Sequence, residues 1–249
     1  MNTQHKPTLR VLSVLQLISE NQHKYSLSEI SRSLDIPAST LLPILHTLRD
    51  QKYLEFNERE QDYSFGIRLF EIGSRMQSST AYSEITAIMS GISEVCNETC
   101  HLGVLDQGDI LYLAKTDSTQ PIRMTSMVGK RIPAYATALG KALLRNASIE
   151  SLKQLYPQGL KPITAYTLTD FEKLYAQLHA DGLFTYESEE ACEDVCCTAI
   201  PIYRNGIPVA ACSVSVPLFR WTAQKRAVVE GALKESVGQF EKIIHYFVF

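Results

Sequence analysis

The chain has 249 residues, of which 45% are hydrophobic and 20% charged, and its net charge is −3. This balance is typical of a folded protein of one large or two modest domains, and it excludes a chain that binds nucleic acid through bulk charge. No apolar run approaches the roughly 20 residues that cross a bilayer, and the polar start MNTQHKPTLR lacks the apolar core of a secretory signal. We therefore expect a cytoplasmic protein with reduced cysteines and no membrane partner.

Three stretches of helical periodicity come first. TLRVLSVLQLISEN has apolar residues at helical spacing, and Thr8 can cap it. In the second stretch, YSLSEISRSLDI, Ser26 and Glu29 fit a capping box. Pro37 opens a third helix that ends near Tyr53. This order is the helix-turn-helix outline, although any three-helix bundle produces it.

A hairpin is predicted directly after the third helix. In YLEFNEREQDYSFG, Leu54 and Phe56 alternate before a polar turn, and Tyr63 and Phe65 alternate after it. Three helices followed by a hairpin are typical of a winged helix-turn-helix.

The third helix contains a proline, Pro43. In a helix interior, proline loses one hydrogen bond and costs about 3 kcal/mol, whereas the first helical positions have no partner to lose. We therefore expect this helix either to begin late, with Thr40 as N-cap, or to be kinked near residues 39–42.

The segment LSEISRSLDIPASTLLPILHTLRDQKYLEFNEREQDYSFGIRLFEIGSRM resembles the N-terminal domain of the IclR family of bacterial transcription regulators, and YSFGIRLFEIG is its most specific part. The resemblance continues over nearly the whole chain. It implies an α+β protein with a winged helix-turn-helix DNA-binding domain in 1–74, its helix-turn-helix near 27–47 and its wing near 53–66. An effector-binding domain with a GAF-like fold, including a linker helix, is expected in 75–249. Ser78–Thr80 should weaken the middle of that linker.

Two positions of the third helix depart from the family pattern. The family usually has Lys where Ala38 stands, and often a basic residue where Pro43 stands. The remaining polar side chains of the helix are our candidate base readers, and one leucine is a candidate to contact a thymine methyl group. Residues outside the helix are candidates to hold phosphates. The candidate DNA contacts are Thr8, Arg10, Ser28, Ser39, Thr40, Leu42, His46 and Arg59. Each of them could instead be an ordinary solvated residue.

The rest of the chain alternates between strand and helix signals. Strands are expected in HLGVLDQGDILYLAKT and IRMTSMVGKRIP, and helices in ATALGKALLRN and SIESLKQLY. TDFEKLYAQLHADG has a capping box at Thr169 and Glu172. Asn205–Gly206 is a strong hairpin turn, and Thr222 can cap a long final helix. Helices beside a largely antiparallel sheet make an α+β domain.

Two of these segments, MTSMVGKRIPAYATALGKALL and ESEEACEDVCCTAIPIYRNGIPVAACSVSVP, resemble the effector domain of the same family. The resemblance implies effector contacts at Ala138, Leu139, Glu187, Cys197, Ser213 and Ser215. Backbone N–H groups at a helix start, together with hydroxyls and a thiol, suit a small carboxylate or polyol.

Two carboxylates in these segments change the expected ligand. Glu187 stands where the family usually has Asp, and Asp194 stands where it usually has Gly. The extra negative charge weakens the case for an anionic effector and leaves a sugar-like or aromatic metabolite open. A simpler interpretation is that Ser213 and Ser215 face solvent and that Cys197 is a small buried hydrophobe.

The cysteines suggest an alternative function. A metal site or redox switch could use Cys96, Cys100, His101, Cys192 and Cys196. Structural zinc sites more often have two residues between paired cysteines than the three found here. The sequence has no G-x-S-x-G, phosphate-loop or dinucleotide motif, so we expect no catalytic residues and no cofactor.

These observations predict a regulator whose binding to a double-stranded DNA operator is modulated by a small-molecule effector. A homodimer or homotetramer is expected on a near-palindromic site. The alternatives are a cysteine-based metal or redox sensor with the same DNA-binding head, and a sensor whose winged helix binds protein.

Overall fold

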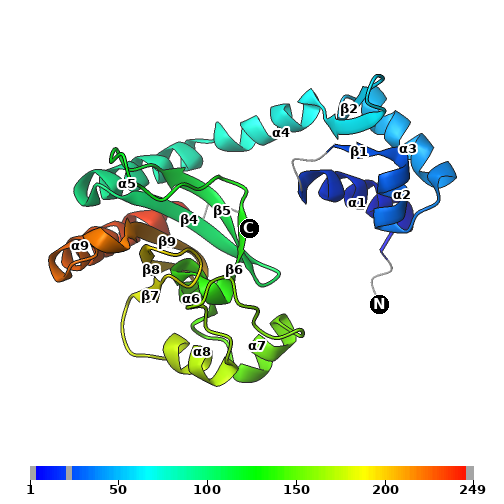
Figure 1. Ribbon diagram of the computed structural model, residues 1–249. Coiled ribbons are helices and arrows are strands. Elements are labelled where there is room, and N and C mark those ends of the chain that lie inside the picture. The colour runs from blue at the N-terminus through cyan, green and yellow to red at the C-terminus, as the bar shows by residue number, and fades with distance from the viewer. Residues whose placement is uncertain (1–3, 21–23, 245–249) are drawn as a thin grey trace. The chain divides into compact units, whose positions relative to one another are not determined.

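The computed structural model describes residues 4–20 and 24–244, and it divides into two compact units, Met1–Ser79 and Thr80–Phe249. Figure 1 shows the elements of both units. The helix α4 (Ile67–Gln77), in which the sequence analysis placed the boundary, belongs to the first unit. The helix α5 (Thr80–Cys96) begins the second unit. The expected linker is thus interrupted between α4 and α5.

The first unit is a three-helix bundle with a small antiparallel sheet, and the prediction of a winged helix-turn-helix is confirmed. Its elements before α4 are α1 (Lys6–Glu20), β1 (Tyr25–Ser26), α2 (Leu27–Leu34), α3 (Ala38–Asp50), β2 (Leu54–Asn57) and β3 (Asp62–Phe65). The strand order is β1-β3-β2. The apolar stripe of each helix faces the hairpin, so that Val14, Ile30, Leu45, Leu54 and Tyr63 share one buried core.

The helix caps agree only in part with the sequence analysis. The capping box of α2 is confirmed, since the Ser26 N–H donates to Glu29 Oε2 at 2.8 Å and the Glu29 N–H donates back to Ser26 Oγ at 3.4 Å. Thr8 does not cap α1, because the helix begins before it. The cap of the later helix α8 is Asp170 rather than Thr169, since Asp170 Oδ1 accepts from the Lys173 N–H at 2.9 Å.

The late start predicted for α3 is wrong. Pro37 is its N-cap, and the Pro37 carbonyl accepts from the N–H groups of Thr40 at 2.9 Å and Leu41 at 3.1 Å. Pro43 therefore lies inside the helix. The buried side chains of Leu41 and Leu45 hold this turn against the core, which offsets the hydrogen bond that proline cannot make.

Pro43→Ala is expected to stabilise α3 by about 1 to 3 kcal/mol, because alanine restores a backbone donor and the Pro43 side chain is exposed. Hydrogen exchange of the α3 amides measures this directly and should slow. Pro37→Ala is the matched control and should change exchange little, because its carbonyl remains as the cap. Unchanged or faster exchange in Pro43→Ala would contradict the prediction.

The second unit is built on a six-stranded antiparallel sheet. The strands are β4 (Thr99–Asp106), β5 (Asp109–Thr116), β6 (Arg131–Pro133), β7 (Thr185–Ser188), β8 (Val195–Arg204) and β9 (Ile207–Pro217), in the order β6-β5-β4-β9-β8-β7. The helical elements after α5 are η1 (Ala134–Ala136), α6 (Ala138–Leu144), α7 (Ile149–Leu155), α8 (Phe171–Leu178), η2 (Leu218–Arg220) and α9 (Ala223–Ile243). The turn at Asn205–Gly206 and the Thr222 cap are confirmed.

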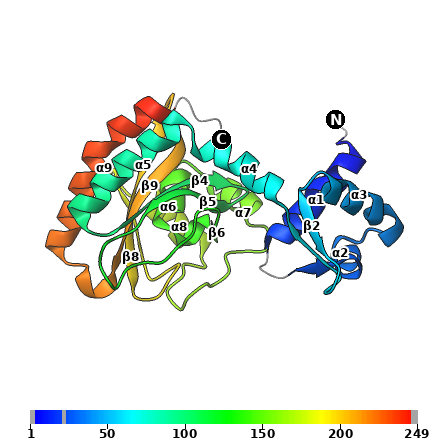
Figure 2. The same ribbon diagram turned by 90° about the horizontal axis from the view of Figure 1, so that it is seen from above.

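Helices cover both faces of this sheet, as Figure 2 shows. The helices α5 and α9 pack on one face, with Met89, Val214 and Phe240 in their core. The helix α6 packs on the other face with Leu139 and Ala211. A strand was expected over 122–133, but only the last three of these residues form one, β6, and the rest is loop. No helix within the described ranges is long and apolar enough to cross a membrane.

Candidate functional site

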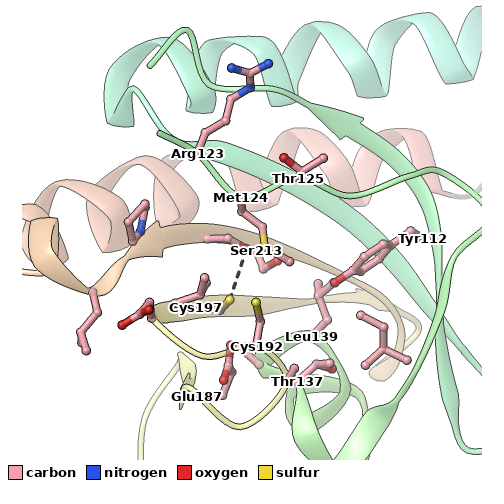
Figure 3. Close-up of a pocket in the computed structure, with 18 of the residues that line it drawn as sticks. Tyr112, Arg123, Met124, Thr125, Thr137, Leu139, Glu187, Cys192, Cys197 and Ser213 are labelled. Carbon is pink, nitrogen blue, oxygen red and sulfur yellow. Dashed lines mark hydrogen bonds between the residues drawn. The ribbon is translucent and has the colours of Figure 1, made fainter. Parts of the chain in front are cut away.

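The α6 side of the sheet holds a cavity of about 790 Å³ (Figure 3). All six effector contacts implied by the family resemblance line it, and they come from three strands and one helix. Apolar wall residues that the sequence analysis did not identify include Tyr112, Ile122, Met124, Ile132 and Val195. The exposed surface of the cavity is therefore mostly apolar, and polar side chains are set into it both on the sheet and at the rim, as in sites for small organic molecules.

Sheet register places the polar groups together. Glu187 on β7 lies opposite Cys197 on β8, and Cys197 lies opposite Ser215 on β9. Side chains directly opposite each other in antiparallel strands point to the same face, so the three form a row under the cavity. Ser213 is two residues from Ser215 and shares that face. Ser213 and Ser215 are each 3% exposed, so they do not face solvent.

The start of α6 forms part of the cavity wall. Thr137 caps the helix, and its Oγ1 accepts from the Gly140 N–H at 2.9 Å. The N–H groups of Ala138 and Leu139 have no acceptor within their own helix, because they belong to its first turn. A Cβ on Gly140 would lie 2.0 Å from the Ala134 carbonyl oxygen, so glycine is required for this close turn. Thr137 could have been found from its capping position.

A buried charged cluster lies beside Glu187. The Lys141 ammonium, 1% exposed, forms an ion pair with Glu190, and the Glu190 N–H donates to Glu187 Oε2 at 3.0 Å. Burial raises the pKa of Glu187 to about 7, although hydrogen bonds from Cys197 and Glu190 and the charge of Lys141 oppose that shift. The end of the cavity thus holds a carboxyl group whose charge changes near neutral pH.

A second polar group stands behind the cavity wall. Cys197 Sγ donates to Ser215 Oγ at 3.2 Å, and Ser215 Oγ lies 3.4 Å from His101 Nδ1. His101 Nε2 lies 2.6 Å from Ser126 Oγ. His101 is fully buried and its ring stacks on Tyr112 with 4.8 Å between centroids. Burial first, and the nearby charge of Lys115 second, lower its pKa to about 4, so the imidazole is neutral at pH 7.

The rim of the cavity is formed by loop 117–130 and residues near η2. Ile122 and Phe219 are exposed apolar side chains, and Lys130 and Asp194 bring one charge of each sign. Asp194 has φ = 60°, a left-handed conformation that favours glycine, which is the residue the family usually has there. Arg123 extends from the loop away from Glu187 and Cys197 in Figure 3.

The five residues of the possible metal or redox site are not brought together. Cys96 and Cys100 lie in the core beneath α5 and α9, whereas Cys192 lines the cavity on the opposite face. Both ring nitrogens of His101 lie within hydrogen-bond distance of serine hydroxyls, and Cys196 Sγ lies 3.3 Å from Ser188 Oγ. Within residues 4–20 and 24–244, no group of three or more His, Cys, Asp or Glu side chains is arranged to hold a metal ion.

The candidate DNA contacts lie on the surface of the first unit. Ser39, Leu42 and His46 are exposed at helical spacing on α3, opposite the buried leucines, and Thr40 beside them is half-buried. Of the expected phosphate contacts, Thr8 and Ser28 are exposed on α1 and α2, Arg10 is half-buried on α1, and Arg59 is exposed in the turn of the wing. The structure places these residues but leaves their contacts with DNA a prediction.

Comparison with known proteins gives the family. The profile described as "IclR helix-turn-helix domain" matches residues 8–58, and "Bacterial transcriptional regulator IclR C-terminal" matches residues 76–241. The HTH-type transcriptional regulator KdgR of Escherichia coli is 32% identical over 224 residues, which cover 87% of this chain and 84% of KdgR. The transcriptional repressor IclR of the same organism is 28% identical over 221 residues, covering 86% and 80%.

Solved structures share the whole architecture. An IclR transcriptional regulator from Alicyclobacillus acidocaldarius superposes with a TM-score of 0.85 at 20% identity, covering 97% of this chain and 99% of that one. An IclR homolog from Microbacterium hydrocarbonoxydans, solved with 4-hydroxybenzoate, gives 0.78 at 23% identity, covering 97% and 100%. The chain therefore belongs to the IclR family of DNA-binding bacterial transcription regulators, in which a C-terminal domain binds an effector.

Proposed function

We propose that the cavity of the second unit is the effector pocket of this regulator, and that Ala138, Leu139, Glu187, Cys197, Ser213 and Ser215 contact the effector. One observation carries the proposal: these six residues come from four separate segments of the sequence, yet all of them line the same cavity. Its volume suits a metabolite, and its mostly apolar surface carries polar groups that could orient one.

The chemistry of the lining favours a small molecule with hydroxyl groups and an apolar or ring portion. Hydroxyls can donate to Glu187 and exchange hydrogen bonds with Ser213 and Ser215, while Tyr112 and Leu139 contact the apolar part. The structural relative solved with 4-hydroxybenzoate, a ring with one hydroxyl and one carboxylate, makes aromatic acids a sensible first class to screen.

Ser215→Ala tests the pocket. In a thermal-shift screen of aromatic acids, sugar acids and polyols, a compound that stabilises the wild type should bind the variant about tenfold more weakly, because one hydrogen bond is lost. Operator binding without ligand should not change. Ser236→Ala is the matched control, since Ser236 lies on α9 and its hydroxyl bonds to the Ala232 carbonyl. Loss of DNA binding together with the ligand response would count against the pocket.

We further propose that α3 enters the major groove and reads bases with Ser39, Thr40, Leu42 and His46. Exposure of three of these side chains on one face of α3 supports this. Phosphates would be held by Thr8, Arg10, Ser28 and Arg59.

Thr40→Ala is expected to weaken specific operator binding about 5- to 100-fold and nonspecific binding much less, because one base contact is lost. Competition binding with operator and scrambled duplexes measures both. Thr47→Ala is the control: this exposed side chain on the same helix bonds to the Pro43 carbonyl and is not a candidate reader. Equal losses on both duplexes would demote Thr40 to a phosphate contact or a structural residue.

We propose that the protein binds a near-palindromic operator as a homodimer or homotetramer. The exposed apolar side chains of the first unit support self-association: Leu12 on α1 is 54% exposed, and Ile67 and Phe70 on α4 are 61% and 72% exposed.

Effector binding would change DNA occupancy through a coupling of about 1 to 3 kcal/mol. Footprinting upstream of the protein's own gene, across a salt series, should protect two half-sites with a steep salt slope.

We propose that the protein is a regulator without catalytic activity or cofactor, acting in the cytoplasm where the operator is. The cavity thiol supports this. Burial and the neighbouring Glu187 raise the pKa of Cys197 well above its usual value, so the group is a neutral thiol, the opposite of an activated nucleophile.

A further inference from the structure

The side chains behind the cavity are linked by hydrogen bonds into one continuous series, which we call the hydrogen-bonded chain. It starts at Glu187, whose side chain shares a hydrogen bond with Cys197, and continues through Ser215 to the imidazole of His101. It ends at Ser126 in loop 117–130. His101 is not among the residues that line the cavity, but its strand β4 lies between β5 and β9, and its ring stacks on that of the lining residue Tyr112. The chain thus connects a group inside the pocket with the loop at its rim.

The hydrogens of such a chain have two consistent arrangements. When the Glu187 carboxyl is protonated it donates to the Cys197 sulfur, the thiol donates to Ser215, and the Ser215 hydroxyl donates to His101 Nδ1. The imidazole hydrogen then sits on Nε2 and points at Ser126. When Glu187 is ionised it only accepts, so the thiol turns to it. The Ser215 hydroxyl turns to the sulfur, and the imidazole must carry its hydrogen on Nδ1.

Only one proton leaves the protein between these arrangements, that of the Glu187 carboxyl. The imidazole keeps a single hydrogen and changes the nitrogen that bears it. Ser126 changes role with it, from acceptor to donor. Because each group in the chain has one hydrogen to give, reversing the first bond reverses all of them.

The charges around the two ends are fixed by other elements. Glu187 faces Lys141 of α6, Glu190 and Cys192 of loop 189–194, Cys197 of β8 and Tyr112 of β5. His101 faces Lys115 and Asp117, with Lys130 further along the loop. Lys115 Nζ also donates to the Ser126 carbonyl at 2.8 Å, which fixes Ser126 beside the imidazole.

We propose that His101 is a positioning residue of the effector pocket, and that its tautomer follows the protonation state of Glu187. The proposal rests on the pocket assignment for its biological meaning. A ligand carboxylate placed near Glu187 favours the protonated form, and a cationic ligand group favours the ionised form. Whether Ser126, in the loop that forms the rim, accepts or donates its hydrogen bond to His101 therefore depends on the sign of the ligand's charge.

Nuclear magnetic resonance of ligand-free, full-length protein with ¹⁵N-labelled histidine tests this. Two-bond ¹⁵N–¹H couplings identify which nitrogen carries the hydrogen, and the contact of the ring with Tyr112 assigns the His101 signals. Between about pH 5.5 and about pH 8.5 the imidazole stays neutral. It should change from the Nε2–H form to the Nδ1–H form with a midpoint near pH 7, where Glu187 loses its proton.

Three variants separate the proposal from a structural role. Glu187→Gln and Ser215→Ala should each leave one tautomer at every pH, because the first removes the titrating group and the second breaks the chain. Ser213→Ala is the matched control: it lies on the same strand and face and lines the same cavity, but it is outside the chain, so the switch should persist.

A single tautomer across the range in the wild type overturns the proposal, whether or not the variants fold. A switch that persists in Glu187→Gln also overturns it. Failure of the pocket assignment would look different. The switch would be present, and no screened ligand would respond to Ser215→Ala.

Discussion

Lys141→Met is expected to destabilise the second unit by about 3 to 5 kcal/mol. Lys141 and Glu190 form an ion pair with side chains 1% and 7% exposed, and Glu190 Oε2 has no hydrogen-bond partner in the described part of the chain. Methionine fills a similar volume but leaves the carboxylate buried without its cation. Thermal or urea unfolding followed by the fluorescence of Trp221, the sole tryptophan of the chain, reports on this unit.

The double variant Lys141→Met/Glu190→Gln is the decisive control. It removes both charges, and replacement of a buried pair by neutral groups is often nearly neutral in free energy, so most of the lost stability should return. A double variant as unstable as Lys141→Met would mean that the lysine acts by packing rather than by charge.

Glu187→Gln is expected to remove a pH dependence of stability. Burial raises the folded-state pKa of Glu187 from 4.5 to about 7, so the folded state binds the proton more tightly than the unfolded state does. Stability from this group is fully present below about pH 4.5, and it falls as the pH rises towards and through about 7. The shift corresponds to roughly 3 kcal/mol, which the wild type should lose across that window and the variant should keep.

Unfolding midpoints measured at a series of pH values, again by Trp221 fluorescence, check this expectation. Glu193→Gln serves as the control, since Glu193 is an exposed carboxyl in the same loop and its removal should leave the profile unchanged. Parallel profiles for wild type and Glu187→Gln would show that the pKa of Glu187 is the same in the folded and unfolded states, so that the group is already ionised in the folded protein near pH 7. The two arrangements of the hydrogen-bonded chain behind the pocket would then not interchange near pH 7, because Glu187 would not lose its proton there.

Local signals predicted the first unit well. Helical periodicity, the capping box at Ser26 and the alternation around the wing are all interactions between residues close in sequence, and the structure has each of them. The errors come from competition between local and tertiary terms. Pro43 favours a late helix start, but burial of Leu41 and Leu45 favours helix through that position and wins.

The candidate pocket could not be derived from local signals. The register that sets Glu187, Cys197 and Ser215 in one row depends on the order of strands in the sheet, which spacing along the chain does not encode. The family resemblance identified these residues, whereas Tyr112 on β5 and His101 on β4 were outside the expected effector contacts, because their place beside the row also depends on the strand order. Residues 122–130 of loop 117–130 were expected to be part of a strand, but their apolar residues, such as Ile122 and Met124, line the cavity and not a sheet core.

The row of facing side chains across β7, β8 and β9 limits how this domain can change over time. Replacing one side chain of the row alters one contact and leaves its neighbours in position. Deleting a single residue from the middle of β8 would turn Cys197 towards α5 and α9 and bring a neighbour of Cys197 to the cavity in its place. New effector specificities in this scaffold should therefore arise by substitution within the strands, and length changes should be confined to loops such as 117–130 and 189–194.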